Sequence, residues 1–285
     1  MTFKKIKFVT DSVADIPEPL VKKWDISVVP CFVNYGGESY ADDGVELVRE
    51  DYYNALPDMD ETPKTAAMPP GIAQEAIENA FNDADHLVIV TTPAKLSGIY
   101  NAMRLGMAEI PQEQVTLIDS GQLSMGIGWQ VIVGAEVAAE TGDVEKTIQT
   151  VKQVKAQQEV YAGLYTLEFL RRSGRVGWAT ANIGALLQIK PVVRVEDGEI
   201  DPVSRVRTFK RVIDKLADLV RAQAPLEKVA ILHVNNMDAH DQLTDLLSDI
   251  LPEDTITGLI GPTLGTHIGP GAIGAAVLRK GWRDT

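Results

Sequence analysis

The sequence predicts an α/β protein of two domains, and three observations carry this prediction. The chain has 285 residues, which is enough for one large domain or two ordinary ones. In the first half, continuous apolar runs alternate with helical patterns, as in a parallel sheet covered by helices on both faces. From about residue 159 onward, hairpin signals mix with helical ones. We therefore expect a Rossmann-like α/β domain over residues 1–155 and an α+β domain with a mixed sheet over residues 156–285.

The elements of the first half follow from apolar periodicity and from Pro near helix starts. Strands are expected at residues 6–11, 26–35, 86–92 and 115–120. Helices are expected at residues 16–24, 69–83, 97–110 and 128–140. The segment YGGESYADDG, residues 35–44, predicts a hairpin or loop. This order predicts a sheet of parallel strands.

The second half has a different pattern, in which one turn stands out. Asp197-Gly198 lies inside residues 190–208 and is a strong signal for a β-hairpin. The other expected strands are residues 160–167, 228–236 and 255–261, and the expected helices are residues 178–189, 209–223 and 238–251. The last residues, 275–285, suffice for one short strand.

Composition excludes several classes of function. The formal net charge of −13 argues against nucleic acid, because phosphate binding requires Lys and Arg, and against adsorption to an anionic membrane. The only cysteine, Cys31, lies in an apolar run and is expected to be a buried thiol. The first residues lack the apolar core of a signal peptide, and the longest apolar stretch is too short to span a bilayer. We expect a cytoplasmic protein with no integral membrane segment.

Polar residues gather where the predicted strands end. Such residues are Thr10-Asp11-Ser12, Thr65, Ser97-Gly98 and Asp119-Ser120. Ligands of open α/β sheets bind at these strand ends, and hydroxyls with helix N-termini suit an anion. The simpler alternative is that each residue caps a helix. Motifs for a nucleophilic serine, a metal cluster or a nucleotide phosphate are absent from the sequence, so we expect no cofactor and no metal.

The segment GPTLGTHIGPGAIG, residues 261–274, contains a match to G-x-G-x-x-G. A dinucleotide fingerprint needs a following helix and a second strand, and residues 275–285 have no room for them. The glycines therefore have another role, and the role of His267 among them needs an explanation. A histidine on a glycine-rich loop presents a ring N–H to an anion, or else bonds to the local backbone.

Six motifs together resemble the DegV family, whose best understood members are the fatty-acid-binding subunits of bacterial fatty acid kinase. The motifs are FVTDSVADI, TPAKLSGIYNA, LIDSGQLSMGIG, LRRSGRV, KPVVRVEDGEIDPVSRVRT and GTHIGPGAIG. The resemblance runs from end to end, and the last motif is the most specific. It implies two α/β domains with a ligand at their interface: an acyl chain buried in a tunnel and a carboxylate at the crevice.

Residue by residue, the resemblance implies that Thr65, Ser97 and His267 contact the carboxylate. Arg175, Arg205 and Arg207 match motifs that the family presents to the kinase or the phosphoryl group; the alternative is solvated surface arginine. The residues expected to shape the loops around the ligand are Gly98, Gly265, Thr266, Gly269 and Gly271. The sequence departs from the family at Ala66-Ala67-Met68, where a second hydroxyl and a Gln are frequent.

The resemblance implies a carrier and not an enzyme: the protein binds a long-chain fatty acid and presents its carboxylate to the catalytic subunit of a fatty acid kinase, which forms the acyl phosphate. The apolar segments 127–133 and 181–189 are expected to line the tunnel, the alternative being a filled core. Two rival functions stay open. One is an enzyme acting alone on a small carboxylate or polyol, as a phosphotransferase or hydrolase, and the other is a sensor for a ligand that is not a lipid.

Overall fold

The computed structural model describes residues 3–180 and 189–284. Its first half contains a parallel sheet of four strands in the order β2-β1-β6-β7. The strands are β1 (Ile6–Asp11), β2 (Ser27–Val29), β6 (His86–Thr91) and β7 (Val115–Asp119). Every residue of β6 is buried, as its continuous apolar run predicted for a strand in the middle of a parallel sheet.

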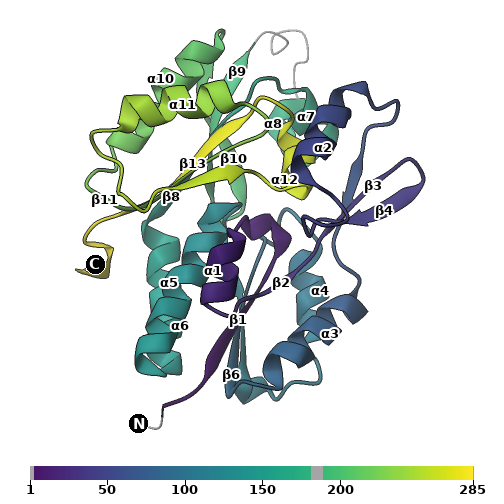
Figure 1. Ribbon diagram of the computed structural model, residues 1–285, viewed down its shortest axis with the longest axis vertical. Coiled ribbons are helices and arrows are strands. Elements are labelled where there is room, and N and C mark those ends of the chain that lie inside the picture. Colours follow the sequence, from purple (N-terminus) through teal and green to yellow (C-terminus); the bar gives the residue numbers. More distant parts are fainter. Residues whose placement is uncertain (1–2, 181–188, 285) are drawn as a thin grey trace.

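Helices cover both faces of this sheet (Figure 1). One pair lies on each side: α3 (Pro70–Phe81) with α4 (Ile99–Gly106), and α5 (Met125–Thr141) with α6 (Val144–Gln157). A short helix, α1 (Glu18–Lys23), joins β1 to β2 after the 3-10 turn η1 (Ser12–Ala14). The other 3-10 turns are η2 (Leu56–Asp58), η3 (Gln112–Gln114) and η4 (Trp282–Asp284). The predicted α/β/α arrangement of the first half is thus confirmed.

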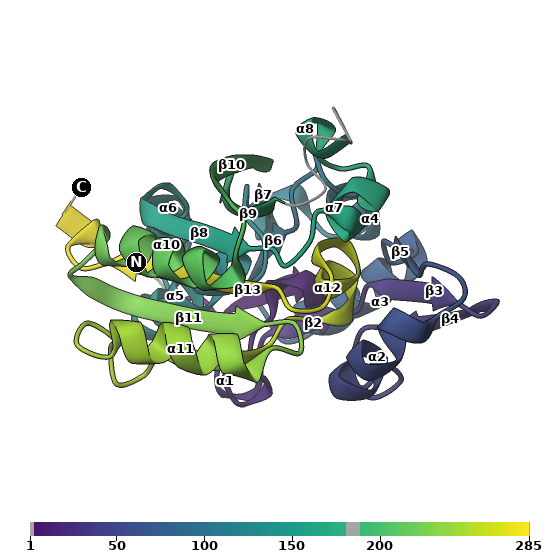
Figure 2. The same ribbon diagram turned by 90° about the horizontal axis from the view of Figure 1, so that it is seen from above.

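The single strand expected at residues 26–35 is wrong, because Pro30-Cys31 divides it into two strands in two different sheets. After this break the chain enters a small antiparallel sheet in the order β4-β3-β5, beside the short helix α2 (Arg49–Ala55) (Figure 2). Its strands are β3 (Phe32–Tyr35), β4 (Glu38–Ala41) and β5 (Lys64–Ala66). Proline has no N–H to donate to a neighbouring strand, so it favours the end of a strand. Cys31 is fully buried, as expected, and burial raises the pKa of its thiol.

The second half forms a mixed sheet of six strands in the order β10-β9-β8-β13-β11-β12, in which only β11 and β12 are parallel neighbours. The strands are β8 (Gln158–Gly163), β9 (Lys190–Glu196), β10 (Glu199–Val206), β11 (Leu226–His233), β12 (Ile256–Leu259) and β13 (Ile273–Arg279). The predicted hairpin is present: Asp197 and Gly198 turn between β9 and β10 with φ of 48° and 73°. Both positive φ values fit the turn type that Asp-Gly favours.

Helices α10 (Phe209–Arg221) and α11 (Met237–Leu247) cover the outer face of the six-stranded sheet, with a core of their own. The inner face shares one continuous core with the first half of the chain. Helix α5 joins the two halves, and its Trp129 donates from Nε1 to the carbonyl of Ala276 in β13 at 3.1 Å. The expected helix at residues 178–189 lies mostly outside the described residues; within them, α8 covers Gly177–Thr180.

Two further short helices lie between the halves. They are α7 (Glu168–Ser173) and α12 (Pro262–Ile268). Helix α12 packs against α7 on one side and against α2, β3 and β5 on the other, so it links the six-stranded sheet to the small sheet (Figure 2). This position places the histidine-bearing segment at the centre of the molecule.

Candidate functional site

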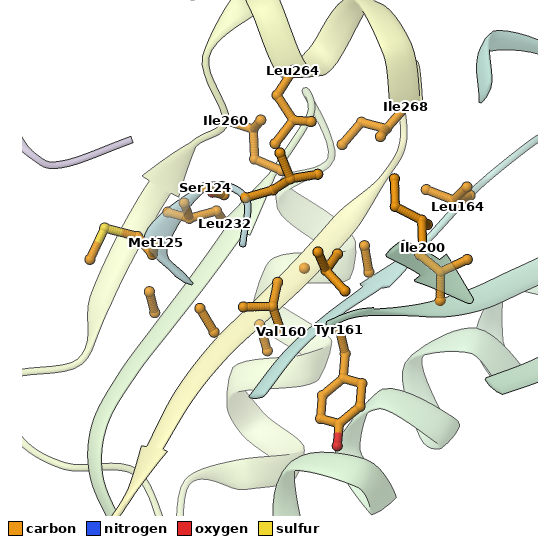
Figure 3. A pocket seen from close by; sticks show the side chains of 18 of the residues that line it. Ser124, Met125, Val160, Tyr161, Leu164, Ile200, Leu232, Ile260, Leu264 and Ile268 are labelled. Atoms are coloured by element: carbon orange, nitrogen blue, oxygen red, sulfur yellow. The ribbon is translucent and has the colours of Figure 1, made fainter. Parts of the chain in front are cut away.

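Two cavities adjoin beneath the inner face of the six-stranded sheet. The first, which we call the apolar chamber, is narrow, with about 50 Å³ of free space, and has an almost wholly apolar lining (Figure 3). The second, which we call the polar chamber, holds about 350 Å³ and is lined in part by Thr65, Lys95, Ser97, Arg175 and His267. The two share the side chains of Leu123, Leu170, Ile200, Leu264 and Ile268. Together they make a site that is apolar at one end and polar at the other.

Strand alternation builds the apolar chamber. Val160 and Leu232 come from β8 and β11, and Ile260 follows β12. Tyr161 comes between Val160 and Ala162, and its ring points away from the other labelled side chains in Figure 3. The Tyr161 side chain packs instead into the core under α10 and α11. Successive side chains of a strand face opposite sides, which is why Val160 and Tyr161 point in opposite directions.

Thr65 and His267 meet in the polar chamber although they lie in different halves of the chain. The hydroxyl Oγ1 of Thr65 is 2.8 Å from Nε2 of His267. Thr65 is held in β5 by pairing with Val33 in the small sheet. His267 lies in the last turn of α12. The structure therefore brings together two of the three residues that the sequence assigned to the carboxylate.

The electrostatic setting keeps His267 neutral. Burial, and then the nearby guanidinium of Arg175, lower the pKa of His267 to about 4. A neutral imidazole has one donor and one acceptor nitrogen, and which nitrogen carries the proton depends on its partners. If Nε2–H donates to Thr65, the hydroxyl proton of Thr65 stays available for an anion. The pair thus offers a donor inside a mainly buried pocket.

The expected loop around His267 is wrong in part, because residues 262–268 form helix α12 and only the segment after it is a loop. Pro262 occupies the first turn of the helix, where a missing N–H costs nothing. Gly269, with a φ of 81°, ends the helix. The glycines in this segment predicted a loop, whereas the helix that forms there is stabilised by tertiary contacts.

Two buried carboxylates hold the start of α12. Asp15 accepts from the N–H of Gly261 at 2.7 Å, and Asp42 accepts from the N–H of Thr263 at 3.0 Å. Asp15 also accepts from the hydroxyl of Ser124, at the start of α5, at 2.6 Å. These bonds satisfy backbone donors that a helix leaves unpaired at its N-terminus. No local sequence pattern indicated this role for Asp15 or Asp42.

Three of the residues expected to shape the loop fit their places for steric reasons. A Cβ on Gly265 would lie 1.9 Å from the Tyr53 hydroxyl, so helix α12 packs against that ring. Gly269 and Gly271 have φ of 81° and 83°, in the left-handed region that favours glycine. Thr266 is buried, and its hydroxyl lies 2.6 Å from that of Tyr52 and donates to the carbonyl of Pro262 at 2.7 Å.

Ser97 and Gly98 bring the start of α4 to the same chamber. The hydroxyl of Ser97 accepts from the N–H of Ile99 at 3.3 Å, so the residue also has the local capping role. A Cβ on Gly98 would lie 3.8 Å from the Cβ of Ala67. Ala66 and Ala67 line the chamber too. The departure from the family pattern at these alanines therefore lies in the site itself.

The other polar strand ends do not line the polar chamber. Asp11 instead accepts from the backbone N–H and the hydroxyl of Thr92, each at 2.8 Å. Asp119 accepts from the N–H groups of Gly121 and Ala94 at 2.9 and 3.0 Å. Both carboxylates thus bind groups of neighbouring segments. Of the four polar strand ends expected at one crevice, only the two that carry Thr65 and Ser97 line the polar chamber.

The three arginines are not one cluster around the chamber. Arg175 lines the polar chamber, and its backbone N–H donates to the hydroxyl of Ser173 at 3.3 Å. Arg205 lies in β10 and Arg207 directly after it, both exposed, and neither lines either chamber. Strand β10 is an edge of the six-stranded sheet. Lys95, which lines the chamber two residues before Ser97, was not among the site residues expected from the sequence.

Charge separates the polar chamber from the rest of the molecule. Among the described residues, its lining includes Lys95 and Arg175 and no acidic side chain, on a protein of net charge −13.

Within residues 3–180 and 189–284, no group of three or more His, Cys, Asp or Glu side chains is placed to hold a metal ion. None of the helices described is long and apolar enough to cross a membrane. The two cations of the polar chamber and the lack of acidic side chains in its lining suit an organic anion.

Comparison with known proteins identifies relatives over nearly the whole chain. The model of the DegV family, a family of uncharacterised proteins, matches residues 5–280. A DegV domain-containing protein of Deinococcus radiodurans is 32% identical, with 95% of this chain and 98% of that protein covered. One from Caldanaerobacter subterraneus is 30% identical, with 97% and 100% covered.

Solved structures agree with this result. A DegV family protein of Thermus thermophilus, whose structure concerns fatty acid binding, superposes with a TM-score of 0.88 at 28% identity, covering 96% of this chain and 99% of that one. A fatty-acid-binding DegV family protein of Streptococcus agalactiae gives a TM-score of 0.87 at 26% identity, with 97% and 99% covered. The two-part α/β fold is that of these proteins.

Proposed function

The chain belongs to the DegV family, and from this premise we propose that it binds a long-chain fatty acid and presents the carboxylate to a partner kinase. One observation carries the proposal: the apolar chamber adjoins the polar chamber that holds the Thr65–His267 pair. A fatty acid has the same division into an apolar chain and an anionic end. Family members of known structure bind fatty acids, which supports the proposal.

The carboxylate binds in the polar chamber. Thr65 donates its hydroxyl proton to one carboxylate oxygen while accepting from Nε2–H of His267, which fixes the tautomer of the ring. Ser97, on the same lining, donates its hydroxyl proton to the carboxylate. Hydrogen bonds to a charged group contribute about 1.5–3 kcal/mol each. These bonds fix which end of the ligand faces the opening.

The acyl chain enters the apolar chamber, whose free space of about 50 Å³ has to widen to take it, and its burial supplies most of the driving force. Burial of methylenes contributes about 0.8 kcal/mol each, so a C16 chain gains roughly 12 kcal/mol before ordering costs. The expectation that residues 127–133 line the tunnel is wrong, because none of them lines either chamber. Leu123 and Met125, just before this segment, line the apolar chamber instead. The segment 181–189 lies outside the described residues except for Ile189.

The partner kinase transfers a phosphoryl group from a nucleoside triphosphate to a carboxylate oxygen, and an acyl phosphate forms while the chain stays buried. Arg175 at the chamber stabilises the added negative charge, since a guanidinium fork suits phosphate oxygens. Arg205, in the edge strand β10, and Arg207, directly after it, are exposed and meet the kinase there. The protein itself thus acts as a carrier and not as a catalyst, and works in the cytoplasm.

Native mass spectrometry of the purified protein tests the binding step. We expect a non-covalent ligand of about 250–300 Da, the range of long-chain acids, which is released by denaturation. A protein that carries no such ligand and takes up none from an added fatty acid contradicts the proposal. Turnover of a small carboxylate or polyol without any partner would instead support the enzyme alternative.

A further inference from the structure

The side chains that line both chambers stand at the passage between them. We call this passage the neck; it consists of Leu123, Leu170, Ile200, Leu264 and Ile268. They come from four separate segments: the connection between β7 and α5, the helix α7, the strand β10 and the helix α12. All five side chains are branched and aliphatic. A ligand that extends from the polar chamber into the apolar chamber therefore passes through a ring of aliphatic side chains.

Helix α12 places the neck beside the histidine of the polar chamber. Leu264 lies three residues before His267 and four before Ile268, so the three side chains share one face of the helix. All three line the polar chamber, and Figure 3 shows Leu264 and Ile268 reaching from α12 toward the inside of the apolar chamber. When a carboxylate is bound at the Thr65–His267 pair, the carbons next to it therefore occupy the neck.

The backbone of α12 is packed closely at positions that line neither chamber. A Cβ on Gly265 would lie 1.9 Å from the Tyr53 hydroxyl, and a Cβ on Gly269 would lie 2.2 Å from Cδ2 of Phe169. The start of the helix is held by the two buried carboxylates described above. Close-packed structure resists displacement. We therefore expect the neck to widen by rotation of its side chains and not by movement of the helix.

We propose, on the basis of the proposed function, that the neck selects fatty acids without a branch next to the carboxylate, and that Leu264 sets its width. Rotated side chains make room for a bare chain of methylene groups. A methyl branch on the carbon next to the carboxylate adds volume inside the neck and overpacks it. Leu264 is only partly buried, whereas Ile268 is 9% exposed, so shortening Leu264 enlarges the neck with less loss of core packing.

The experiment compares two acids that differ by one methyl group. One is hexadecanoic acid, and the other is hexadecanoic acid methylated on the carbon next to the carboxylate. Their affinities for the whole protein, stripped of ligand, are measured by displacement of a fluorescent acid. We expect the natural protein to bind the branched acid about 10-fold more weakly than the unbranched one, because the added methyl group overpacks the neck.

Two substitutions on α12 test where the selection arises. Leu264→Ala enlarges the neck and should reduce the ratio of the two affinities to about threefold or less. Ile268→Val removes one methylene group from the neck and should lower the ratio by a smaller factor; this mild change remains informative if the alanine variant is poorly folded. Leu105→Ala, exposed in α4 and outside both chambers, is the control and keeps the natural ratio.

The outcomes distinguish this inference from the proposed function. A natural protein that binds neither acid overturns both. Equal affinity of the natural protein for the two acids overturns the selection and leaves fatty acid binding intact. A ratio that stays the same in Leu264→Ala and in Ile268→Val overturns the placement of the selection at the neck.

Discussion

Asp15 accepts a hydrogen bond of 2.7 Å from the backbone N–H of Gly261, 246 residues away in the sequence. The bond joins the turn after the first strand of the chain to the start of the helix that carries His267. Asp15, in the first motif that resembles the DegV family, therefore contacts the residue that begins the helix leading into the last one. The position of the histidine depends on both halves of the protein.

Asp15→Asn tests the electrostatic state of this contact. Burial raises the pKa of Asp15 to about 6, partly offset by Arg49, against about 3.9 in the unfolded chain. The folded protein thus binds the proton more tightly, and its stability falls as the pH rises through 4 to 6. The asparagine variant lacks this loss, so its stability relative to the natural protein should improve by up to about 3 kcal/mol between pH 4 and pH 8.

Urea denaturation across that pH range measures the difference. Asp60→Asn, at an exposed position, is the control for the substitution itself. A difference for Asp15→Asn that is equally flat means that the carboxylate is ionised without penalty.

Gly265→Ala tests the packing of α12. Its Cβ would lie 1.9 Å from the Tyr53 hydroxyl, so the helix or the ring has to shift, at a cost of about 1–3 kcal/mol. Gly71→Ala in α3 is a matched control, with no atom within 4 Å of the added Cβ and better helix propensity. Thermal unfolding should separate the two, and equal stability of the two variants would disprove the close packing.

Ser97→Ala, Thr65→Val and His267→Asn test the carboxylate site. Each removes a hydrogen-bonding group at or beside the anion, so each should weaken fatty acid binding about 10- to 100-fold while the fold is kept. Ser39→Ala, exposed in β4, should bind normally. Calorimetric titration measures the constants, and unchanged affinity in all three variants would refute the assignment.

The protonation of His267 gives a spectroscopic test of the same site. In the free protein its imidazole should titrate near a pKa of about 4, because burial and Arg175 disfavour the cation. A bound carboxylate should raise this pKa, and so should Arg175→Ala, whereas Arg205→Ala should not. NMR of the ring protons follows each titration. A free protein whose His267 titrates at the ordinary value of about 6.5 contradicts the buried setting.

Arg205→Ala and Arg207→Ala separate binding from presentation. Neither side chain lines a chamber, so both variants should bind fatty acid with the natural affinity. Acyl phosphate formation with the cognate kinase should fall, and docking of the natural pair should weaken with salt. Lipid binding and product formation are assayed on the same samples. Normal phosphorylation by both variants would mean that these arginines are only solvated surface.

Local patterns in the sequence predicted much of the fold. The buried strand β6, the amphipathic helices and the Asp197-Gly198 turn were correct because each follows from neighbouring residues alone. The hairpin or loop expected at residues 35–44 is the hairpin of β3 and β4. The sheet that this hairpin forms with β5 was missed, since β5 has only three residues, lies well beyond the hairpin in the sequence and carries little periodicity. The division at Pro30 was the visible signal for it.

The sequence by itself determined which chemical groups the protein has, their order along the chain and which motifs are absent from it. It describes an acidic α/β protein with hydroxyl groups at the ends of strands and a histidine among glycines. Only the tertiary structure decided which of these residues meet. It paired Thr65 with His267 across two halves of the chain, left Asp11 to bind Thr92, and kept Arg205 away from the chambers. The physical reason is that hydrogen bonds and cavities depend on distances in space, and these are fixed by the packing of α12 between two sheets that no local pattern encodes.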